Sequence, residues 1–294
     1  MSGGLLALRA RIAAPVATVR HALTDVGSLR VWLAEHAGPA MTFWGRHTPD
    51  GAGPRQHLRR LDDRCVRFDW RLWHVDTSVH IGLSAASGGG TVLSLCQTEV
   101  PDWAEMAGED TPLSVLGTFW SLALANLADH LEGRPLTPKT DFVSPELHVE
   151  IPLAATPGAV FASLVEPARF GTWFGTVLET DARIGGPWVV GTFELIGPGA
   201  TIVALAPGRR LTVAENGFET GWELTPADYG TRLSLQHTGF DERNPPYAGW
   251  TGWLAGLAGL RRHHDGARPI WLRRVLPGVP ATLITAGRAA AAER

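Results

Sequence analysis

Hydrophobic and polar residues alternate with a period of two along several short segments of the chain. In residues 147–153, Leu147, Val149, Ile151 and Leu153 alternate with polar residues and a proline, which is the pattern of a strand with one buried face. Similar short runs, separated by glycine and proline turns, predict further strands. In the second half of the chain these are 187–195, 201–205, 210–214, 220–224 and 231–237. Residues 5–12 predict a strand at the start of the first half.

Other segments have the spacing of amphipathic helices. Thr156 is a suitable N-cap and Pro157 suits the first helical position, after which Val160, Phe161 and Leu164 fall on one face. A second short helix is expected to end at Trp173. Long helices are predicted over 112–131 and 247–264. The order of strand, two short helices, several strands and a long helix predicts an α+β fold, in which an antiparallel sheet buries one face against the final helix.

The pattern occurs twice. Trp32 is matched by Trp173 in the second half of the chain, and Trp120 is matched by Trp253. The segment Thr-Val-Leu-Ser-Leu-Cys-Gln-Thr at 91–98 is matched by Thr-Arg-Leu-Ser-Leu-Gln-His-Thr at 231–238. Matches in the same order at nearly constant separation indicate two copies of one domain. We predict a first domain over 1–134, a linker over 135–145, a second domain over 146–267 and a C-terminal tail over 268–294.

Three sets of residues carry a family resemblance. Residues 12–32 follow the pattern I-x-A-P-x-x-x-V-x-x-A-L-T-D-x-x-x-L-x-x-W, residues 185–188 read Gly-Gly-Pro-Trp, and residues 230–240 read Gly-Thr-Arg-Leu-Ser-Leu-Gln-His-Thr-Gly-Phe. This resembles the START-like, or SRPBCC, helix-grip superfamily. The second copy is similar to the C-terminal domain of activators of the 90-kDa heat-shock protein ATPase. The resemblance implies two tandem helix-grip domains, each a curved antiparallel sheet around a long C-terminal helix.

The same resemblance implies a cavity between sheet and helix that takes apolar or amphipathic molecules. It supplies no shared catalytic motif. Candidate lining residues are the large aromatic, aliphatic and polar side chains on the expected inner faces: Trp70, Leu72, His74, Gln97, Trp188, Phe193, Trp222, Leu235, His237 and Trp253.

Among these candidates, His237 has the side chain that can take part in the widest range of chemistry. It alternates with Leu233 and Leu235, so the three side chains share one strand face. It can hydrogen-bond a ligand or titrate near neutral pH, or it can be a core histidine bonded to backbone. Gln97 occupies the matched position in the first copy and cannot act as an acid or base at neutral pH. His74 is expected to continue the face of Phe68, Trp70 and Leu72.

The composition and the missing motifs narrow the classes of function that we expect for this chain. The net charge of −3 gives no general attraction to nucleic acid. The chain lacks an apolar run of about 20 residues and a recognisable signal peptide, so we expect no membrane span and a cytoplasmic location. Metal-binding, serine-nucleophile and phosphate-loop motifs are missing, so we expect no cofactor and no metal. Arg261, Arg262, His263 and His264 are expected to be cationic residues at a helix C-terminus.

Three hypotheses follow. The first is a non-enzymatic tandem START-like protein that binds a small apolar or amphipathic ligand, with a chaperone-cofactor-like role as one form of it. The second is a polyketide cyclase-like or dehydratase-like enzyme that uses His237 or His74 as acid or base. The third is a regulatory module that binds a protein partner through the apolar tail at 270–276. The sequence leaves the ligand, the oligomeric state and the openness of the first cavity undecided.

Overall fold

The computed structural model describes residues 4–100, 115–144, 146–191, 199–240 and 247–275. The chain divides into two compact units. Unit 1 comprises Met1–Val143, Tyr247–Ala258 and Pro269–Val279, and unit 2 comprises Ser144–Pro246, Gly259–Arg268 and Pro280–Arg294. The boundaries of the predicted linker and tail remain predictions, but the final long helix and the segment after it contribute to both units.

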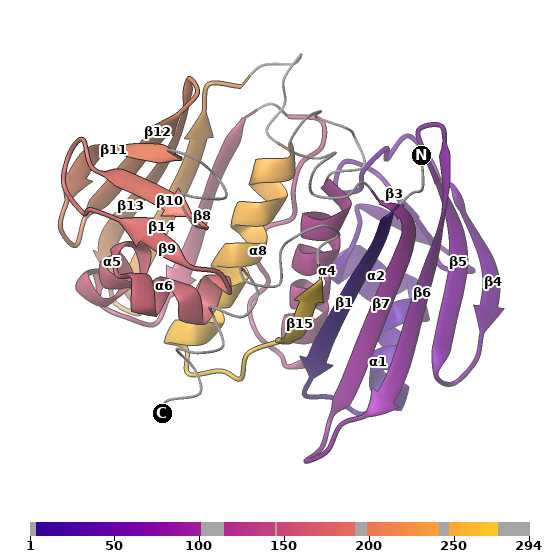
Figure 1. Ribbon diagram of the computed structural model, residues 1–294. Coiled ribbons are helices and arrows are strands. Elements are labelled where there is room, and N and C mark those ends of the chain that lie inside the picture. The colour runs from indigo at the N-terminus through magenta and orange to yellow at the C-terminus, as the bar shows by residue number, and fades with distance from the viewer. Residues whose placement is uncertain (1–3, 101–114, 145, 192–198, 241–246, 276–294) are drawn as a thin grey trace. The chain divides into compact units, whose positions relative to one another are not determined.

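Unit 1 contains a six-stranded antiparallel sheet in the order β15-β1-β7-β6-β5-β4 (Figure 1). Its strands are β1 (Gly4–Ile12), β4 (Gln56–Leu61), β5 (Cys65–Leu72), β6 (Val75–Ala85), β7 (Thr91–Val100) and β15 (Trp271–Val275). Its helices are α1 (Val16–Thr24), α2 (Val26–Trp32), α4 (Leu116–Leu131) and the first part of α8 (Tyr247–His264). A small hairpin pairs β2 (His36–Gly38) with β3 (Thr42–Trp44).

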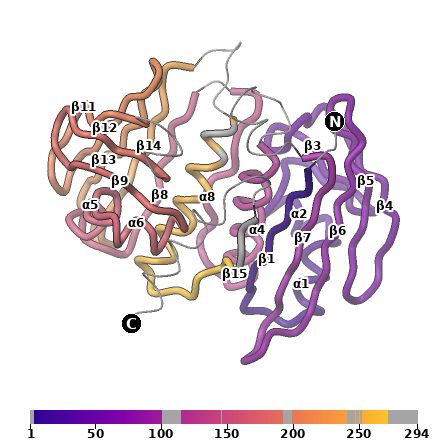
Figure 2. Tube along the Cα trace, in the orientation of Figure 1, coloured from indigo at the N-terminus to yellow at the C-terminus, as the bar shows by residue number. Residues whose placement is uncertain are grey.

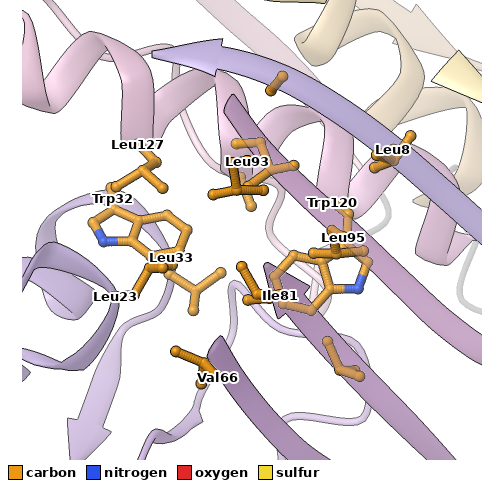
Figure 3. Close-up of a cluster of buried hydrophobic side chains, with 14 of the residues drawn as sticks. Leu8, Leu23, Trp32, Leu33, Val66, Ile81, Leu93, Leu95, Trp120 and Leu127 are labelled. Atoms are coloured by element: carbon orange, nitrogen blue, oxygen red, sulfur yellow. The ribbon is translucent and has the colours of Figure 1, made fainter. Parts of the chain in front are cut away.

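The core of unit 1 lies between this sheet and α4. Figure 3 shows Trp32 of α2 and Trp120 of α4 among Ile81, Leu93 and Leu95 of the sheet, and each of the five is completely buried. Burial of one such side chain contributes about 1.5–3 kcal/mol. The long helix predicted over 112–131 is observed from Leu116 to Leu131, and residues 112–114 of the predicted range lie outside the described part of the chain.

Unit 2 contains a seven-stranded antiparallel sheet in the order β8-β14-β13-β12-β11-β10-β9, whose path can be followed in Figure 2. Its strands are β8 (Leu147–Leu153), β9 (Leu178–Thr180), β10 (Pro187–Val190), β11 (Ala200–Ala206), β12 (Arg210–Glu215), β13 (Phe218–Ala227) and β14 (Gly230–Thr238). Two short helices, α5 (Pro157–Val165) and α6 (Pro167–Phe174), follow β8. Thr156 caps α5 through a 3.4 Å bond from the Ala159 N–H, as predicted.

Matched positions make the same local contacts in the two units. The indole N–H of Trp32 donates to the carbonyl of Ala22 at 3.0 Å, and that of Trp173 donates to the carbonyl of Ser163 at 2.9 Å. When the two copies of the sequence are aligned, Trp32 aligns with Trp173, and the acceptor residue Ala22 aligns with the acceptor residue Ser163. The α+β class and the tandem arrangement predicted from the sequence are therefore confirmed.

A second matched contact lies at the turn before β7 and β14. The hydroxyl of Thr91 donates to the Ala14 carbonyl at 2.7 Å, and that of Thr231 donates to the Ala155 carbonyl at 2.6 Å. The preceding residue of the second copy is Gly230, where an added Cβ would stand only 2.6 Å from the Leu153 carbonyl oxygen. Only glycine allows this close approach at its φ of +128°.

The segment predicted as a linker is fixed to unit 1. Lys139, the only lysine of the chain, donates from Nζ to the carbonyls of Arg30, Val31 and Ala34 at 3.0–3.2 Å. These carbonyls lie at the C-terminal end of α2, where unpaired acceptors favour a cation. A paired hydrogen bond also joins the Asn126 amide to the backbone of Thr137, at 2.9 Å in each direction.

Part of the predicted tail is a strand. β15 pairs antiparallel with β1 from Ala7 to Ala10, with a register shift between Arg9 and Ala10, and the Arg11 N–H donates to the Ile270 carbonyl at 2.7 Å. Ile270 belongs to the buried core of unit 1. In the second copy the position matched to Arg11 is Pro152, which has no N–H to donate. The edge of β8 therefore cannot offer the equivalent hydrogen bond.

None of the helices formed by the described residues has the length and apolar character needed to cross a membrane.

Candidate functional site

His237 lies near the end of β14, on the face of the unit 2 sheet that carries the buried residues. Leu233 and Leu235 on the same face are completely buried, whereas His237 is half-buried. The register places His237 opposite Thr220 on β13 and opposite Leu147 on β8. Both neighbours are buried. His237 is thus a polar side chain at the end of the apolar strand face formed by Leu233 and Leu235.

One aromatic ring, that of Phe240, covers one side of the imidazole. The Phe240 ring meets the His237 ring edge-to-face, with centroids 4.5 Å apart. Phe240 is itself stacked on Phe218 at 4.3 Å with the ring planes 11° apart. The imidazole is consequently in contact with apolar carbon rather than with water on this side.

The nitrogen Nδ1 of His237 is buried and has no hydrogen-bond partner among the residues that the structure describes. Burial lowers the pKa of the ring to about 4, because charging it would require removing a cation from water. The side chain is therefore a neutral imidazole at pH 7, with one nitrogen able to donate and the other able to accept. An unsatisfied buried polar atom costs about 1–3 kcal/mol, so this position calls for a partner.

The tryptophan candidates of unit 2 lie in its packed interior. Trp188 and Trp222 are buried with ring centroids 5.3 Å apart, and Trp188 also meets Phe170 at 5.6 Å. The indole N–H of Trp188 donates to the Leu164 carbonyl at 3.1 Å. Trp188 thus joins the sheet to α5. Phe193 lies outside the described residues.

In unit 1 the position matched to His237 is Gln97, and both ends of its side-chain amide form hydrogen bonds. Gln97 is completely buried, and its Oε1 accepts the indole N–H of Trp120 at 2.6 Å. Its Nε2 donates to the hydroxyl of Thr77 at 3.0 Å, and that hydroxyl donates to the Trp70 carbonyl at 2.8 Å. The amide therefore uses both of its ends within the protein.

Aromatic side chains fill the space around Gln97. The Trp70 ring lies 6.0 Å from Trp120, 5.9 Å from Phe119 and 5.1 Å from Phe43, measured between centroids. Trp70 and Leu72, two further candidates, are buried in the same interior. These rings pack edge-to-face or tilted, which is the usual arrangement of an aromatic core.

The sequence pattern predicts the wrong position for one candidate, His74. His74 does not continue the face of Phe68, Trp70 and Leu72, because β5 ends at Leu72 and Trp73 adopts a left-handed φ of +51°. The turn is held by Asp50, which accepts the Trp73 N–H. His74 is left exposed to solvent in the turn. Trp253, the last candidate, is half-buried in the part of α8 that belongs to unit 1.

Arg261, Arg262, His263 and His264 lie in the last turn of α8, as expected, but His264 is not the cation that was predicted there. Arg261 and Arg262 are buried, and Arg262 donates through Nε and Nη2 to the carbonyl of Arg268. His264 lies with Nε2 3.2 Å from the hydroxyl of Ser163, and burial lowers its pKa to about 4. The helix end thus packs into unit 2, and His264 is neutral at pH 7.

Sequence reasoning missed the partners of His237 and of Gln97. Phe240 lies just beyond the predicted strand, in the Thr-Gly-Phe motif at 238–240, and Phe218 lies just before the predicted strand at 220–224. The alternation of Phe218, Thr220 and Trp222 was the available signal. In the described residues, histidine, cysteine and carboxylate side chains do not gather into a group that can hold a metal ion. Cys65 and Cys96 are free thiols.

Comparison with known proteins agrees with this architecture. Residues 154–262 match the family model described as "Activator of Hsp90 ATPase homolog 1-like protein". The resemblance identified from the sequence is thereby confirmed for the second copy. No curated protein matches the chain.

Several solved structures are similar to the chain. DynU16, described as a protein in the dynemicin biosynthetic locus, is 19% identical over 90% of this chain and 99% of its own, with a TM-score of 0.36. An AHSA1-like protein from Rhizobium etli is 24% identical over 44% of this chain and 90% of its own, with a TM-score of 0.36. The Aha1 dimer from Colwellia psychrerythraea is 18% identical over 41% and 96%, with a TM-score of 0.36.

Proposed function

We propose that unit 2 binds a small apolar or amphipathic molecule at the His237 end of β14, and that it does so without catalysing a reaction. The single observation that carries the proposal is the buried Nδ1 of His237, which lacks a partner among the described residues. A bound molecule with a polar group would satisfy this nitrogen, while Phe240 and the neighbouring apolar face would contact the rest of it.

The two copies are proposed to differ in function. In unit 1 the matched Gln97 is already bonded to Trp120 and Thr77, and the surrounding rings pack against one another. A ligand there would have to break two buried hydrogen bonds before forming its own. We therefore assign the binding role to unit 2 and a structural role to unit 1.

The enzymatic alternative has less support. His74 is exposed in a turn, so it is not a candidate for acid–base work in an enclosed site. General acid–base catalysis is most effective when the pKa of the catalytic group lies near the working pH, and burial moves that of His237 to about 4. Its Nδ1 has no carboxylate partner among the described residues that could orient the ring.

A direct test is native mass spectrometry of the purified chain, followed by quenching of tryptophan fluorescence with apolar ligands. We expect a co-purified small molecule or saturable quenching. His237→Leu should weaken binding about tenfold, the equivalent of one lost hydrogen bond of roughly 1.4 kcal/mol.

The matched control is His148→Leu, which changes an exposed histidine on β8 that is bonded to Ser234. It should leave binding unchanged. If neither bound ligand nor saturable quenching is found, or if both variants weaken binding equally, the proposed site is wrong.

A further inference from the structure

We infer that the ligand presents an uncharged hydroxyl to His237, and that carboxylates, phosphates and ammonium groups are disfavoured there. The inference rests on the proposed function and specifies the chemical class that the site would select. It follows from three features of the described residues: the neighbours of the imidazole, the placement of charge on the surrounding strands, and the hydrogen bonds at the matched position of unit 1.

Among the residues that the structure describes, the groups that face the imidazole are uncharged. Its register neighbours are Thr220 and Leu147, and its ring neighbour is Phe240. The next residues on the same face of β13 and β14 are Trp222 and Leu235, both completely buried. No charged side chain among the described residues contributes to lowering the pKa of the ring, which burial alone explains.

The charged residues of these three strands lie on the opposite, exposed face of the sheet. They alternate with the buried positions and are Glu150 of β8, Glu219 and Glu223 of β13, and Arg232 of β14; His148 of β8 shares this exposed face. Transferring an anion or a cation into a site with no compensating charge costs far more than one hydrogen bond returns. The inner face therefore favours an uncharged polar group.

Unit 1 shows what kind of group satisfies this position. At the matched residue, the acceptor Oε1 of Gln97 receives the N–H of an indole, which is a neutral donor on a flat apolar body. The other end of the amide is satisfied by a neutral hydroxyl, that of Thr77. A neutral imidazole offers the same pair of functions, one acceptor and one donor. A ligand hydroxyl can donate to Nδ1 of His237 when that nitrogen carries no proton. It can accept from Nδ1 when that nitrogen carries the proton.

The experiment compares three probes that share one apolar body: naphthalene, 2-naphthol and 2-naphthoate. Binding to the whole chain is measured by isothermal titration calorimetry at pH 7 in two buffers of different ionisation enthalpy. We expect 2-naphthol to bind about tenfold more tightly than naphthalene, with no proton exchange, and 2-naphthoate to bind more weakly than both.

The variant His237→Leu should abolish the advantage of 2-naphthol and leave the affinity for naphthalene unchanged, which separates a polar contact from a folding defect. Tightest binding of 2-naphthoate, accompanied by uptake of a proton, would overturn the inference while supporting a ligand site at His237. An unchanged preference for 2-naphthol in His237→Leu would also overturn it. Absence of binding for all three probes, with no co-purified ligand, would overturn the proposed function itself.

Discussion

The indole nitrogen of Trp120 lies 2.6 Å from Oε1 of Gln97, and both side chains are completely buried in unit 1. The bond joins α4 to β7 across the interior, and Thr77 extends it to β6. The matched position in unit 2 holds His237, whose Nδ1 is without a partner in the described part of the chain. The matched position thus holds a closed hydrogen-bond network in one unit, and in the other a buried nitrogen without a partner among the described residues.

This relationship predicts that Gln97 is important for stability. Gln97→Leu removes both ends of the amide and leaves the indole N–H of Trp120 without its acceptor. One buried polar group left unpaired costs about 1–3 kcal/mol, so we expect a loss of this size in the free energy of unfolding, while the Thr77 hydroxyl keeps its bond to the Trp70 carbonyl. Urea denaturation followed by far-ultraviolet circular dichroism measures the loss.

The control for Gln97→Leu is Ser94→Ala, which changes an exposed residue on the same strand. It should shift the urea midpoint very little. If Gln97→Leu shifts the midpoint no more than Ser94→Ala does, the network does not stabilise unit 1.

Two half-buried histidines of unit 2, His237 and His264, predict a dependence of stability on pH. Burial lowers the pKa of His237 and of His264 to about 4, below the ordinary value of 6.5 expected in the unfolded chain. Between these values the unfolded chain binds more protons, so stability falls as the pH is lowered from about 6.5 towards 4. After allowance for partial solvent exposure, each histidine accounts for on the order of 1 kcal/mol.

Thermal unfolding of the chain and of His237→Leu from pH 7.5 to pH 4.5 tests this dependence. The variant should lose less stability than the unmodified chain as the pH falls. Direct NMR titration of the imidazole resonances gives a second measurement. A His237 resonance that titrates near pH 6.5 would show that the ring is solvated, and it would contradict the proposed burial.

The parts of this protein that could be predicted from the sequence are those set by local pattern. The alternation of residues 147–153 gives the bounds of β8, and the apolar spacing of residues 247–264 gives those of α8. The alternation of Leu233, Leu235 and His237 places the histidine on the buried face. In each case the periodicity of the element alone determines which side chains share a face.

The features that could not be predicted depend on the path of the chain beyond each helix or strand. His74 continues the period of β5, but the left-handed turn at Trp73 removes it from the strand. Arg261 and Arg262 lie at the predicted helix end, but the local sequence does not reveal that they are buried there. Phe240 reaches the His237 ring across a bend at Gly239, whose φ is +98°. Strand or helix periodicity gives no signal for a turn at one residue or for the burial of a helix end.

Ser163 and His264 form a polar pair where the first copy has an apolar one. The matched residues of the first copy are Ala22 and Leu131. Ser163→Ala removes the partner of His264 Nε2, 3.2 Å away, and should cost about 1 kcal/mol. In Ser163→Ala/His264→Leu the loss should be largely recovered, because an apolar pair replaces the polar one.

A double-mutant cycle on thermal or urea stability measures the coupling, which we expect to be about 1 kcal/mol. The hydroxyl of Ser163 keeps its 3.2 Å bond to the Ala159 carbonyl in His264→Leu, so that variant should be the milder of the two. Strict additivity of the two single changes would show that the side chains do not interact.

The backbone bond between Arg11 and Ile270 predicts that the β1 edge is sensitive to proline. Arg11→Pro removes the N–H that donates to the Ile270 carbonyl and makes the edge resemble that of β8, where Pro152 stands. Arg11→Ala keeps the N–H and changes only the side chain. We expect Arg11→Pro to be less stable than Arg11→Ala by on the order of 1–3 kcal/mol, and the backbone amides of β15 to exchange hydrogen faster.

Hydrogen–deuterium exchange of peptides covering residues 4–12 and 270–275 compares these two variants. Because Ile270 is part of the unit 1 core, deletion of residues 268–294 should likewise lower the melting temperature. Equal exchange in the two variants, together with an unchanged melting temperature on deletion, would show that β15 is not needed for unit 1. That outcome would restore a separate partner-binding role for the tail, since its apolar residues would then have no structural task.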